Sequence, residues 1–155
     1  MNILIVNGPN LNLLGKREPN IYGADTLSDI ENWINIELRN RNIKLQWYQS
    51  NHEGKIVDRL HRAMYDKNDG IIINPGAYTH YSYAIRDAIA AISIPTIEVH
   101  LSDIKSREKF RQTSVIKDVC LEQITGLGKS GYLGAIYALE KYINRLNLNS
   151  DTIPF

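Results

Sequence analysis

This sequence has little cysteine, little net charge and no long apolar run. Its 155 residues include one cysteine, Cys120, so an intrachain disulfide and the metal sites built from four cysteines are excluded. We expect Cys120 to be a small buried hydrophobic residue in a late strand. Lys and Arg number 18 and Asp and Glu 17, for a net charge of +1. The composition therefore gives no sign of nucleic acid or an anionic membrane as a partner.

Signals for export or membrane insertion are also lacking. Met1 and Asn2 lead directly into an apolar run, without the charged segment and cleavage site of a signal peptide. No apolar run reaches the roughly 18 residues that a membrane-spanning helix needs. We expect a cytoplasmic protein. The length and the 43% hydrophobic content predict one domain over residues 1–155.

What the sequence does contain is a regular alternation of strand and helix signals. Short apolar runs predict strands, and apolar residues three and four positions apart predict amphipathic helices. The predicted strands are residues 3–6, 43–49, 70–74, 96–101 and 119–125, and the predicted helices begin near residues 27, 56, 82 and 132. Five βα units predict an α/β fold, a flavodoxin-like doubly wound sandwich. Its five-stranded parallel sheet would have the order 2-1-3-4-5, with helices on both faces.

Three segments stand outside this alternation. Residues 8–25 form a long loop that mixes glycine and proline with apolar residues, which predicts a lid over a binding site rather than a linker. The charged residues 102–112 predict a short helix or a loop. The tail, residues 147–155, is polar until Ile153-Pro154-Phe155. It is expected either to be loose or to pack on a neighbour.

Polar residues follow the predicted strands at their carboxyl ends, where ligands bind in sheets of this kind. They are Asn7 and Asn10 after the first strand, Asn74 and His80 after the third, and Glu98, His100, Ser102, Arg107 and Arg111 at or after the fourth. Amides, imidazoles and guanidinium groups suit a small, oxygen-rich, anionic substrate that is handled by proton transfer. Asn74 could also be a simple turn residue, and His80 a surface residue at the start of a helix.

Glu98 and His100 are the most informative pair among these residues. They are two positions apart in a strand, so both side chains leave the same face. Because carboxylates are seldom buried without a partner, we favour a Glu98 that orients the imidazole of His100 over a packing role. A metal site is less favoured, since no third ligand accompanies the pair at a suitable spacing. His52 and His61 are interpreted as solvated or packing residues.

A glycine-rich segment, GLGKSG at residues 126–131, imitates two nucleotide-binding motifs. The phosphate-binding P-loop would need a glycine where the chain has Gln123. The dinucleotide motif G-x-G-x-x-G would need a further strand and an acid about 20 residues later, and only one helix remains. We interpret these glycines as a tight turn and a close helix–sheet contact. A phosphoacceptor domain is excluded because Asn7 and Asn74 stand where it needs acids. A flavin-binding domain is not favoured either, because the first loop lacks the Ser and Thr residues expected of a flavin phosphate site.

Five motifs in combination resemble the type II 3-dehydroquinate dehydratases, the small dehydroquinases of the shikimate and quinate pathways. The motifs are NGPNLNLLGKREPNIYG at residues 7–23, SNHEG at 50–54, INPGAYTHYSYAIRDA at 73–88, EVHLS at 98–102 and REKFR at 107–111. The glycine turn and Tyr132 also fit this family, whereas residues 115–123 diverge and the tail after Leu146 offers no motif to compare.

The resemblance implies both an assembly and a reaction. The subunit would be flavodoxin-like, and a neighbour would complete each site in a trimer, with four trimers commonly forming a homododecamer. As a hydro-lyase, the protein would remove water from 3-dehydroquinate to give 3-dehydroshikimate, in aromatic amino acid biosynthesis or quinate catabolism. Metal, cofactor and Schiff base would not be needed.

Catalytic roles follow from the resemblance position by position. Tyr22 resembles the catalytic base, and Arg17 is similar to the lid arginine beside it. Asn10 resembles the residue that stabilises the enolate through an ordered water. His100 is similar to the general acid, with Glu98 behind it.

Substrate-binding roles follow in the same way. The residues that resemble the groups holding the substrate's carboxylate and hydroxyls are Asn74, His80, Arg111 and the backbone at Leu101 and Ser102. Asp87 resembles the residue that is contributed across the trimer interface.

The residue types fit this chemistry on their own terms. A free tyrosine has a pKa of about 10 and is a poor base at neutral pH. A nearby guanidinium lowers that pKa, which is the role expected of Arg17.

The alternative to a dehydratase is a non-catalytic binding module of the same fold that senses a nucleotide or a small acid. It would explain the fold and the glycine turn, but not a lid with Tyr22 and Arg17 opposite a histidine backed by Glu98.

Overall fold

A parallel sheet of five strands lies at the centre of the computed structural model, which describes residues 1–16 and 24–150, the last two by backbone alone. The strands are β1 (Asn2–Asn7), β2 (Lys44–Gln49), β3 (Gly70–Asn74), β4 (Thr96–His100) and β5 (Glu122–Thr125). Their order, β2-β1-β3-β4-β5, confirms the predicted order. The winding reverses between β1 and β3, so the helices that follow these two strands lie on opposite faces of the sheet, and ligands bind at this edge in sheets of this kind.

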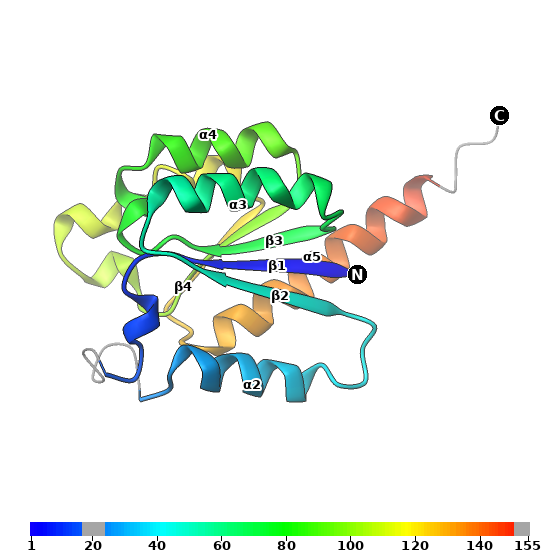
Figure 1. The fold of residues 1–155 in the computed structure, drawn as a ribbon, viewed down its shortest axis with the longest axis horizontal. Helices are drawn as coiled ribbons and strands as arrows, with labels where there is room; N and C mark the ends of the chain where they lie inside the picture. Colours follow the sequence, from blue (N-terminus) through cyan, green and yellow to red (C-terminus); the bar gives the residue numbers. More distant parts are fainter. Residues whose placement is uncertain (17–23, 151–155) are drawn as a thin grey trace.

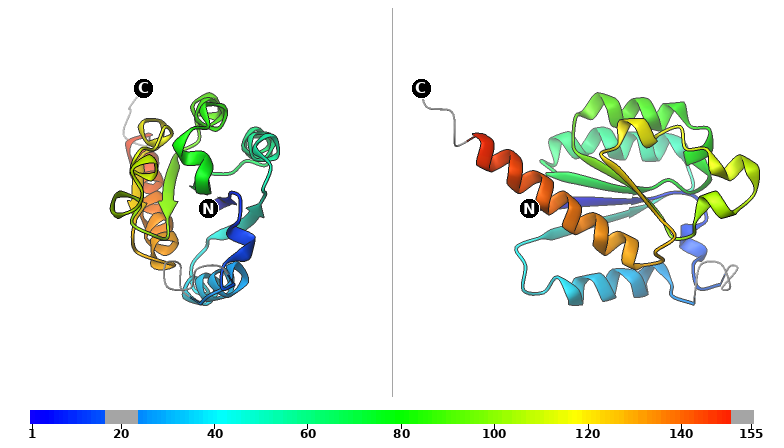
Figure 2. Two further views of the ribbon diagram at one scale, coloured as in Figure 1. Left: turned by 90° about the vertical axis from the view of Figure 1, so that its left-hand side faces the viewer. Right: turned by 180° about the vertical axis from the view of Figure 1, so that it is seen from behind.

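Helices cover both faces of the sheet (Figure 1). Helices α2 (Leu27–Glu37) and α5 (Ser130–Ser150) lie on one face, and α3 (Glu53–Tyr65) and α4 (Tyr83–Ile92) lie on the other. Each face has its own apolar core. The left view of Figure 2 shows the sheet between the two helical layers. The predicted flavodoxin-like doubly wound sandwich is confirmed.

The sequence explains why the elements begin where they do. Strands β1 and β3 are buried on both faces, which is why their apolar runs do not alternate. Helix α2 begins with a capping box, in which the Thr26 hydroxyl accepts from the Asp29 amide and the Asp29 carboxylate accepts from the Thr26 amide. The Ser82 hydroxyl caps α4 by accepting from the Ile85 amide. These caps fix the ends of the helices that flank the loops of the site.

The loops after β1 and β3 are locked together. The amide of Gly8 donates to the carbonyl of Asn74 at 2.7 Å. A Cβ atom at position 8 would lie 2.3 Å from the carbonyl oxygen of Pro75, so only glycine allows the two loops to approach this closely. The glycine and proline residues of the two motifs therefore set the floor of the space between the loops.

The last strand begins later than predicted. Residues Lys117–Val119 form a 3-10 turn, and β5 begins at Glu122. Cys120 lies between these elements, partly buried against the core under α3 and α4. The prediction that Cys120 sits inside a strand was wrong, because its apolar neighbours pack a connection rather than pair in the sheet.

The C-terminal region also differs from the prediction. Helix α5 continues to Ser150, past the expected start of the tail at residue 147, and its far end points away from the sheet (Figure 2). Residues 147–150 contain neither glycine nor proline, so nothing in them ends the helix. The charged segment after β4 forms two short 3-10 helices, Ile104–Ser106 and Lys109–Gln112, as predicted.

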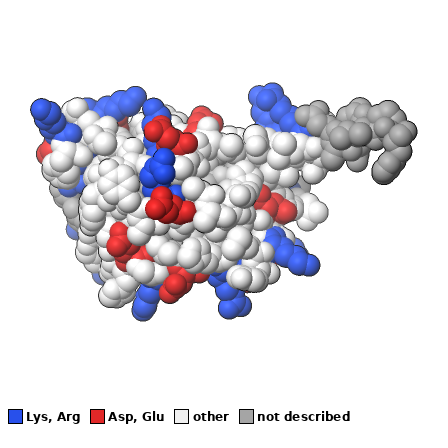
Figure 3. Space-filling model, turned by 90° about the horizontal axis from the view of Figure 1, so that it is seen from above, with Lys and Arg blue, Asp and Glu red and all other residues white. Residues whose placement is uncertain are grey.

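Charge is mixed on the face seen in Figure 3, where acidic and basic side chains lie side by side. Arg59 and Arg62 of α3, for example, both pair with Asp66, the residue that follows the helix. Among the helices that the structure describes, none is both long and apolar enough to cross a membrane.

Candidate active site

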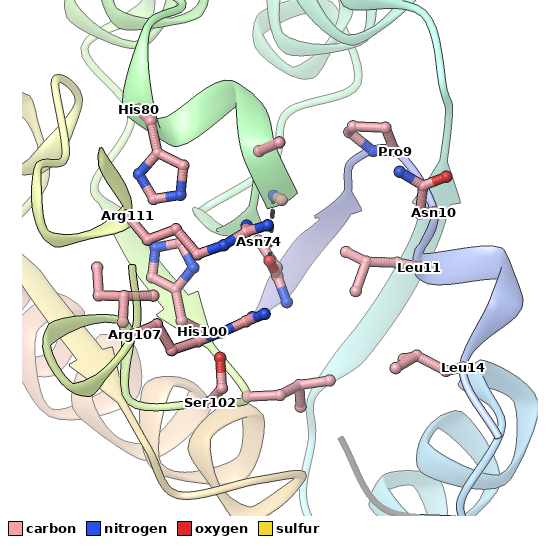
Figure 4. A pocket seen from close by; sticks show the side chains of 14 residues that line it. Pro9, Asn10, Leu11, Leu14, Asn74, His80, His100, Ser102, Arg107 and Arg111 are labelled. Carbon is pink, nitrogen blue, oxygen red and sulfur yellow. Dashed lines mark hydrogen bonds between the residues drawn. The ribbon is translucent and has the colours of Figure 1, made fainter. Parts of the chain in front are cut away.

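A pocket of about 260 Å³ opens at the carboxyl ends of β1, β3 and β4. In Figure 4, His80, His100, Arg107 and Arg111 line one side of it, and Asn10, Leu11 and Leu14 line the other. The complete lining is Pro9, Asn10, Leu11, Leu14, Asn74, Gly76, Ala77, His80, His100, Leu101, Ser102, Ile104, Arg107 and Arg111. One side is thus cationic and the other is largely apolar, which suits a small ring that carries an anionic group.

Most of the site residues expected from the sequence meet in this pocket. Those that line it are Asn10, Asn74, His80, His100, Leu101, Ser102 and Arg111. Glu98 lies behind His100 and does not reach the pocket surface. Asp87 is on α4, with its side chain 79% exposed, and does not line the pocket. Arg17 and Tyr22 lie outside the described residues.

Glu98 and His100 form a buried pair, as their spacing predicts. The Nε2 atom of His100 lies 2.6 Å from Oε1 of Glu98, and the two residues are 6% and 0% exposed. Because the carboxylate is a hydrogen-bond acceptor, Nε2 carries the proton in this contact. The other ring nitrogen, Nδ1, is left for the pocket. The carboxylate therefore fixes both the direction and the tautomer of the imidazole.

Three further side chains hold the Glu98 carboxylate. Thr79 donates its hydroxyl to Oε1, Ser114 donates its hydroxyl at 2.9 Å, and Nε2 of Gln123 donates to Oε2 at 2.8 Å. Burial raises the pKa of Glu98, but the hydrogen bond and charge of His100 and the bonds from Thr79 and Gln123 outweigh it. The pKa of Glu98 therefore lies below its usual value, and the carboxylate stays ionised at neutral pH.

His80 is the second imidazole of the pocket and is held by the backbone. Its Nδ1 donates to the carbonyl of Thr113 at 2.7 Å, and its ring lies edge-on to Phe110. Burial lowers the pKa of His80 first of all, and the positive charges of His100 and Arg111 lower it further, although the Thr113 carbonyl and Glu98 act in the opposite direction. A neutral His80 has a free acceptor at Nε2.

Arg111 is placed by its neighbours in the charged segment after β4. Its Nε donates to Glu108 at 2.9 Å, and its guanidinium lies 4.7 Å from the centre of the Phe110 ring. Its side chain is 19% exposed. A guanidinium held by both a carboxylate and an aromatic ring presents its remaining N–H groups in a fixed direction, which suits a carboxylate or hydroxyl of a substrate.

The other side of the pocket is formed by the beginning of the lid segment. Asn10 has a left-handed backbone (φ 67°) and leads into a 3-10 turn, Leu11–Leu13. Its amide donates to the side chain of Asn51 at 3.0 Å, so the SNHEG motif supports this turn. Leu11 and Leu14 are buried and face the pocket. The lid begins as a defined turn that brings the Asn10 side chain to the pocket.

Several contributors were not identified from the sequence. Thr79 lies in a short 3-10 helix, Gly76–His80, and Ser114 lies in a loop, while the sequence pattern gave Gln123 no role beyond its mismatch to the P-loop. All three side chains contact the carboxylate of Glu98, and the contact of Gln123 depends on the register of β4 with β5, where Glu98 stands opposite Gln123. Arg107 lines the pocket and was noted as a residue after the fourth strand, but the resemblance gave it no role.

The glycine-rich segment adopts the turn that was predicted. Gly126 and Gly128 have positive φ angles of 78° and 53°, and Gly131 packs closely on Val99 of β4. In the described part of the chain no strand follows α5, as a dinucleotide site would require. Residues 1–16 and 24–150 contain no group of three or more His, Cys, Asp or Glu side chains that could hold a metal ion.

Comparisons with known proteins agree with this geometry. The sequence model of the class II dehydroquinases matches residues 1–140. The chain is 54% identical to a 3-dehydroquinate dehydratase of Caldicellulosiruptor bescii over 142 residues, 92% of this chain and 98% of that protein. It is 58% identical to one of Bacillus mycoides over 137 residues, 88% of this chain and 93% of that protein.

Solved structures give the same result. The crystal structure of the type II dehydroquinase from Butyrivibrio crossotus matches with a TM-score of 0.88 and 54% identity, covering 90% of this chain and 97% of that one. The type II dehydroquinase from Propionibacterium acnes matches with a TM-score of 0.83 and 38% identity, covering 92% and 96%. By sequence and by fold, the chain belongs to the class II dehydroquinase family.

Proposed function

We propose that the pocket dehydrates 3-dehydroquinate to 3-dehydroshikimate through an enolate intermediate, with Tyr22 as base and His100 as general acid. The dehydratase activity itself follows from membership of the family. The observation that carries the proposed mechanism is the buried Glu98–His100 pair, which faces a pocket lined by amide and guanidinium groups. A buried imidazole with one nitrogen fixed and the other open to the pocket is built to move a proton.

The proton for the leaving hydroxide comes from His100. In the imidazolium both nitrogens carry protons, and the proton on Nδ1 is given up while Nε2 keeps its bond to Glu98. An ionised Glu98 stabilises the positive charge before the transfer. Proton transfer by a positioned side chain of this kind contributes about 10²–10⁴-fold to the rate.

The base is Tyr22, with Arg17 beside it. Both belong to the lid motif at residues 7–23 and lie outside the described residues, so their roles follow from the resemblance to the family. A tyrosine can remove a proton next to a ketone only as the phenolate, and a nearby guanidinium favours the phenolate. Asn10, which the structure places at the pocket, stabilises the enolate oxygen through a water.

The rest of the pocket holds the substrate. Asn74, Arg111 and the backbone at Leu101 and Ser102 supply donors for the carboxylate and hydroxyl oxygens. His80 differs from them, because burial keeps it neutral and its Nδ1 is bound to Thr113. Its Nε2 is therefore an acceptor for a substrate hydroxyl.

Asp87 supports an assembly in which subunits share sites. Its carboxylate is exposed and lies away from its own pocket, so a role in catalysis requires a neighbouring subunit. The trimer and the homododecamer expected from the resemblance would supply that neighbour. Sedimentation velocity measures the assembly, and an active monomer would contradict the shared site.

The test of the mechanism is the replacement Tyr22→Phe. Wild-type protein mixed with 3-dehydroquinate should show the growing near-ultraviolet absorbance of a conjugated enone. Tyr22→Phe should abolish this rise and spare substrate binding measured by calorimetry. Near-native turnover by the variant would refute Tyr22 as the base. A flat trace from folded wild-type protein would refute the activity and favour the binding module.

The Schiff-base route is tested separately. Borohydride traps a covalent imine between a lysine and a ketone substrate. Treatment with borohydride and 3-dehydroquinate should leave the activity intact, whereas progressive inactivation would show that a lysine takes part.

A further inference from the structure

Tyr132 has no role in the mechanism above, yet its hydroxyl lies directly behind the pocket. It belongs to the first turn of α5, follows the glycine turn and is 0% exposed. Its oxygen lies 3.2 Å from Nδ2 of Asn74 and 2.5 Å from Oδ1 of Asn7. A single phenol thus links the ends of β1 and β3, and one of its partners, Asn74, lines the pocket.

The hydrogen bonds around Tyr132 run in one direction. The backbone N–H of Gly76 can only donate, so the Asn74 atom 3.2 Å from it is the oxygen, as Figure 4 shows. Nδ2 of Asn74 then faces Tyr132 and donates to its hydroxyl oxygen. The Tyr132 hydroxyl must place its own proton elsewhere, and it donates to Oδ1 of Asn7. Gly76 therefore binds the oxygen of the Asn74 amide and Tyr132 binds its nitrogen, and the phenol passes the direction of the hydrogen bonds on to Asn7.

We propose that Tyr132 is a positioning residue that fixes the side-chain amide of Asn74, so that Asn74 presents an N–H donor to an oxygen of the substrate. This inference rests on the proposed function, in which Asn74 holds the substrate. With Oδ1 bound to Gly76 and one N–H bound to Tyr132, the second N–H of Asn74 is left for the pocket. A flipped amide would instead offer an acceptor, which repels a carboxylate.

Burial makes Tyr132 a fixed hydrogen-bonding group rather than a second base. Its pKa is raised well above the usual value by burial, although the bond from Asn74 acts in the opposite direction. The phenol is therefore neutral at every pH at which the enzyme would be studied. Its hydroxyl accepts from one amide and donates to the other, which a phenylalanine ring cannot do.

The environment of Tyr132 leaves few other ways to hold Asn74. The ring of Trp47 lies 5.8 Å from that of Tyr132. Trp47 Nε1 and Asn7 Nδ2 are buried, and neither has a hydrogen-bond partner among the described residues. Both are donors, so neither can replace the Tyr132 oxygen as an acceptor for Asn74. Loss of the hydroxyl would leave the Asn74 amide held by Gly76 alone.

The replacement Tyr132→Phe tests the proposal with a one-atom deletion. Asn74 is proposed to bind the part of the substrate that does not react, so its bond acts equally in the ground state and the transition state. We expect KM for 3-dehydroquinate to rise about tenfold, the value of one well-placed hydrogen bond, with kcat within a factor of two. Tyr137→Phe on the same helix is the matched control, because its ring is 37% exposed and lies under Arg41.

A double-mutant cycle separates positioning from stability. If Tyr132 acts through Asn74, Tyr132→Phe should add nothing to the KM of Asn74→Ala, whereas independent effects would multiply. Asn7→Leu, which removes the acceptor of the Tyr132 proton, should raise KM in the same direction and serves if Tyr132→Phe does not fold. A lower melting temperature with unchanged KM in either variant would overturn the proposal and make Tyr132 a purely structural residue.

A crystal structure of Tyr132→Phe provides a readout that does not depend on activity. The Asn74 amide should leave its wild-type orientation in this variant and keep it in Tyr137→Phe. If wild-type protein lacks dehydratase activity but Asn74 still moves, the proposed function fails and the positioning by Tyr132 stands. If the enzyme is active and Asn74 does not move, the positioning fails alone.

Discussion

Two buried polar networks reach the same pocket from opposite faces of the sheet. Glu98 alternates with Ile97 and Val99, which belong to the core under α2 and α5, so its carboxylate points to the α3–α4 side. Asn74 follows Ile73 of the other core and points to the α5 side, where Tyr132 binds it. One network contains a carboxylate and an imidazole, and the other consists of amides and a phenol.

The networks differ in what they have to stabilise. The charged one surrounds Glu98 with donors from Thr79, Ser114, Gln123 and His100, because a buried carboxylate without them would be costly. The neutral one tolerates a buried Asn7 Nδ2 that has no partner in the described part of the chain. We infer that the charged network serves proton transfer and the neutral one fixes a shape, so mutations should affect kcat in the first and KM in the second.

The largest effect is expected from His100→Gln. Glutamine can still donate to Glu98 but has no proton to transfer to the leaving group. We expect kcat to fall by about 10²–10⁴-fold with little change in KM, measured from the enone absorbance. His61→Gln, at an exposed position on α3, is the control and should keep wild-type kcat. A kcat loss below tenfold would mean that another group supplies the proton.

A smaller loss is expected from Glu98→Gln, with a change in acid stability. The variant keeps the shape of Glu98 and removes its charge, so kcat should fall by about 10²-fold because the imidazolium loses its partner. In the wild type, the pKa of Glu98 is lower in the folded state than in the unfolded state. The unfolded state therefore binds more protons as the pH falls, and stability present near neutral pH is lost on acidification through the folded pKa.

Urea unfolding between pH 7 and pH 3 measures this contribution. The unfolding free energy of Glu98→Gln should depend less on pH over this range than that of the wild type. Glu122→Gln, at an exposed position on β5, should follow the wild type. Parallel curves for the wild type and Glu98→Gln would mean that Glu98 is not the ionised group the geometry indicates.

Gln123→Leu should have a moderate effect of the same kind. The substitution keeps the approximate volume and removes one of the donors to Glu98. Because that donor lowers the pKa of Glu98, its loss should move the acid destabilisation to a higher pH. We expect kcat to fall by only about three- to tenfold, because one hydrogen bond to the charged carboxylate is lost and the others remain. Gln46→Leu on β2 is the control, and equal effects of the two substitutions would contradict a specific role of Gln123.

The ends of strands could be read from the sequence, whereas contacts between strands could not. Asn74, Glu98 and His100 were placed correctly because each stands at the carboxyl end of an apolar run, and those ends share one edge in a parallel sheet. The partnership of Glu98 with Gln123 depends on the register of two strands that are joined by 21 intervening residues. Their side-chain alternation is too short and too irregular to fix that register.

The contacts of Tyr132 and Cys120 could not be predicted from the sequence, for different reasons. The sequence shows Tyr132 as an apolar position of the last helix. Its hydrogen-bond partners could not be predicted, because a helical pattern does not show where the hydroxyl of a buried tyrosine points. Cys120 was assigned to a strand because the apolar residues around it resemble one, although they pack a connection. For both residues, the local sequence pattern indicated that the side chain is at least partly buried but did not show which residues it contacts.

The smallest effect is expected at Cys120, because the pKa of its thiol depends in part on the charge of Glu98. Burial first, and the negative charge of Glu98 second, raise the pKa of its thiol to about 12. At pH 8 an aromatic disulfide reagent should therefore modify native protein at least a hundredfold more slowly than a free thiol, whose pKa is about 8.5. Glu98→Gln should accelerate the reaction only a few-fold, because burial is the larger cause. Tyr132→Phe, on the opposite face of the sheet, should leave the rate unchanged, and equal acceleration by both variants would show that they loosen the fold rather than report separate networks.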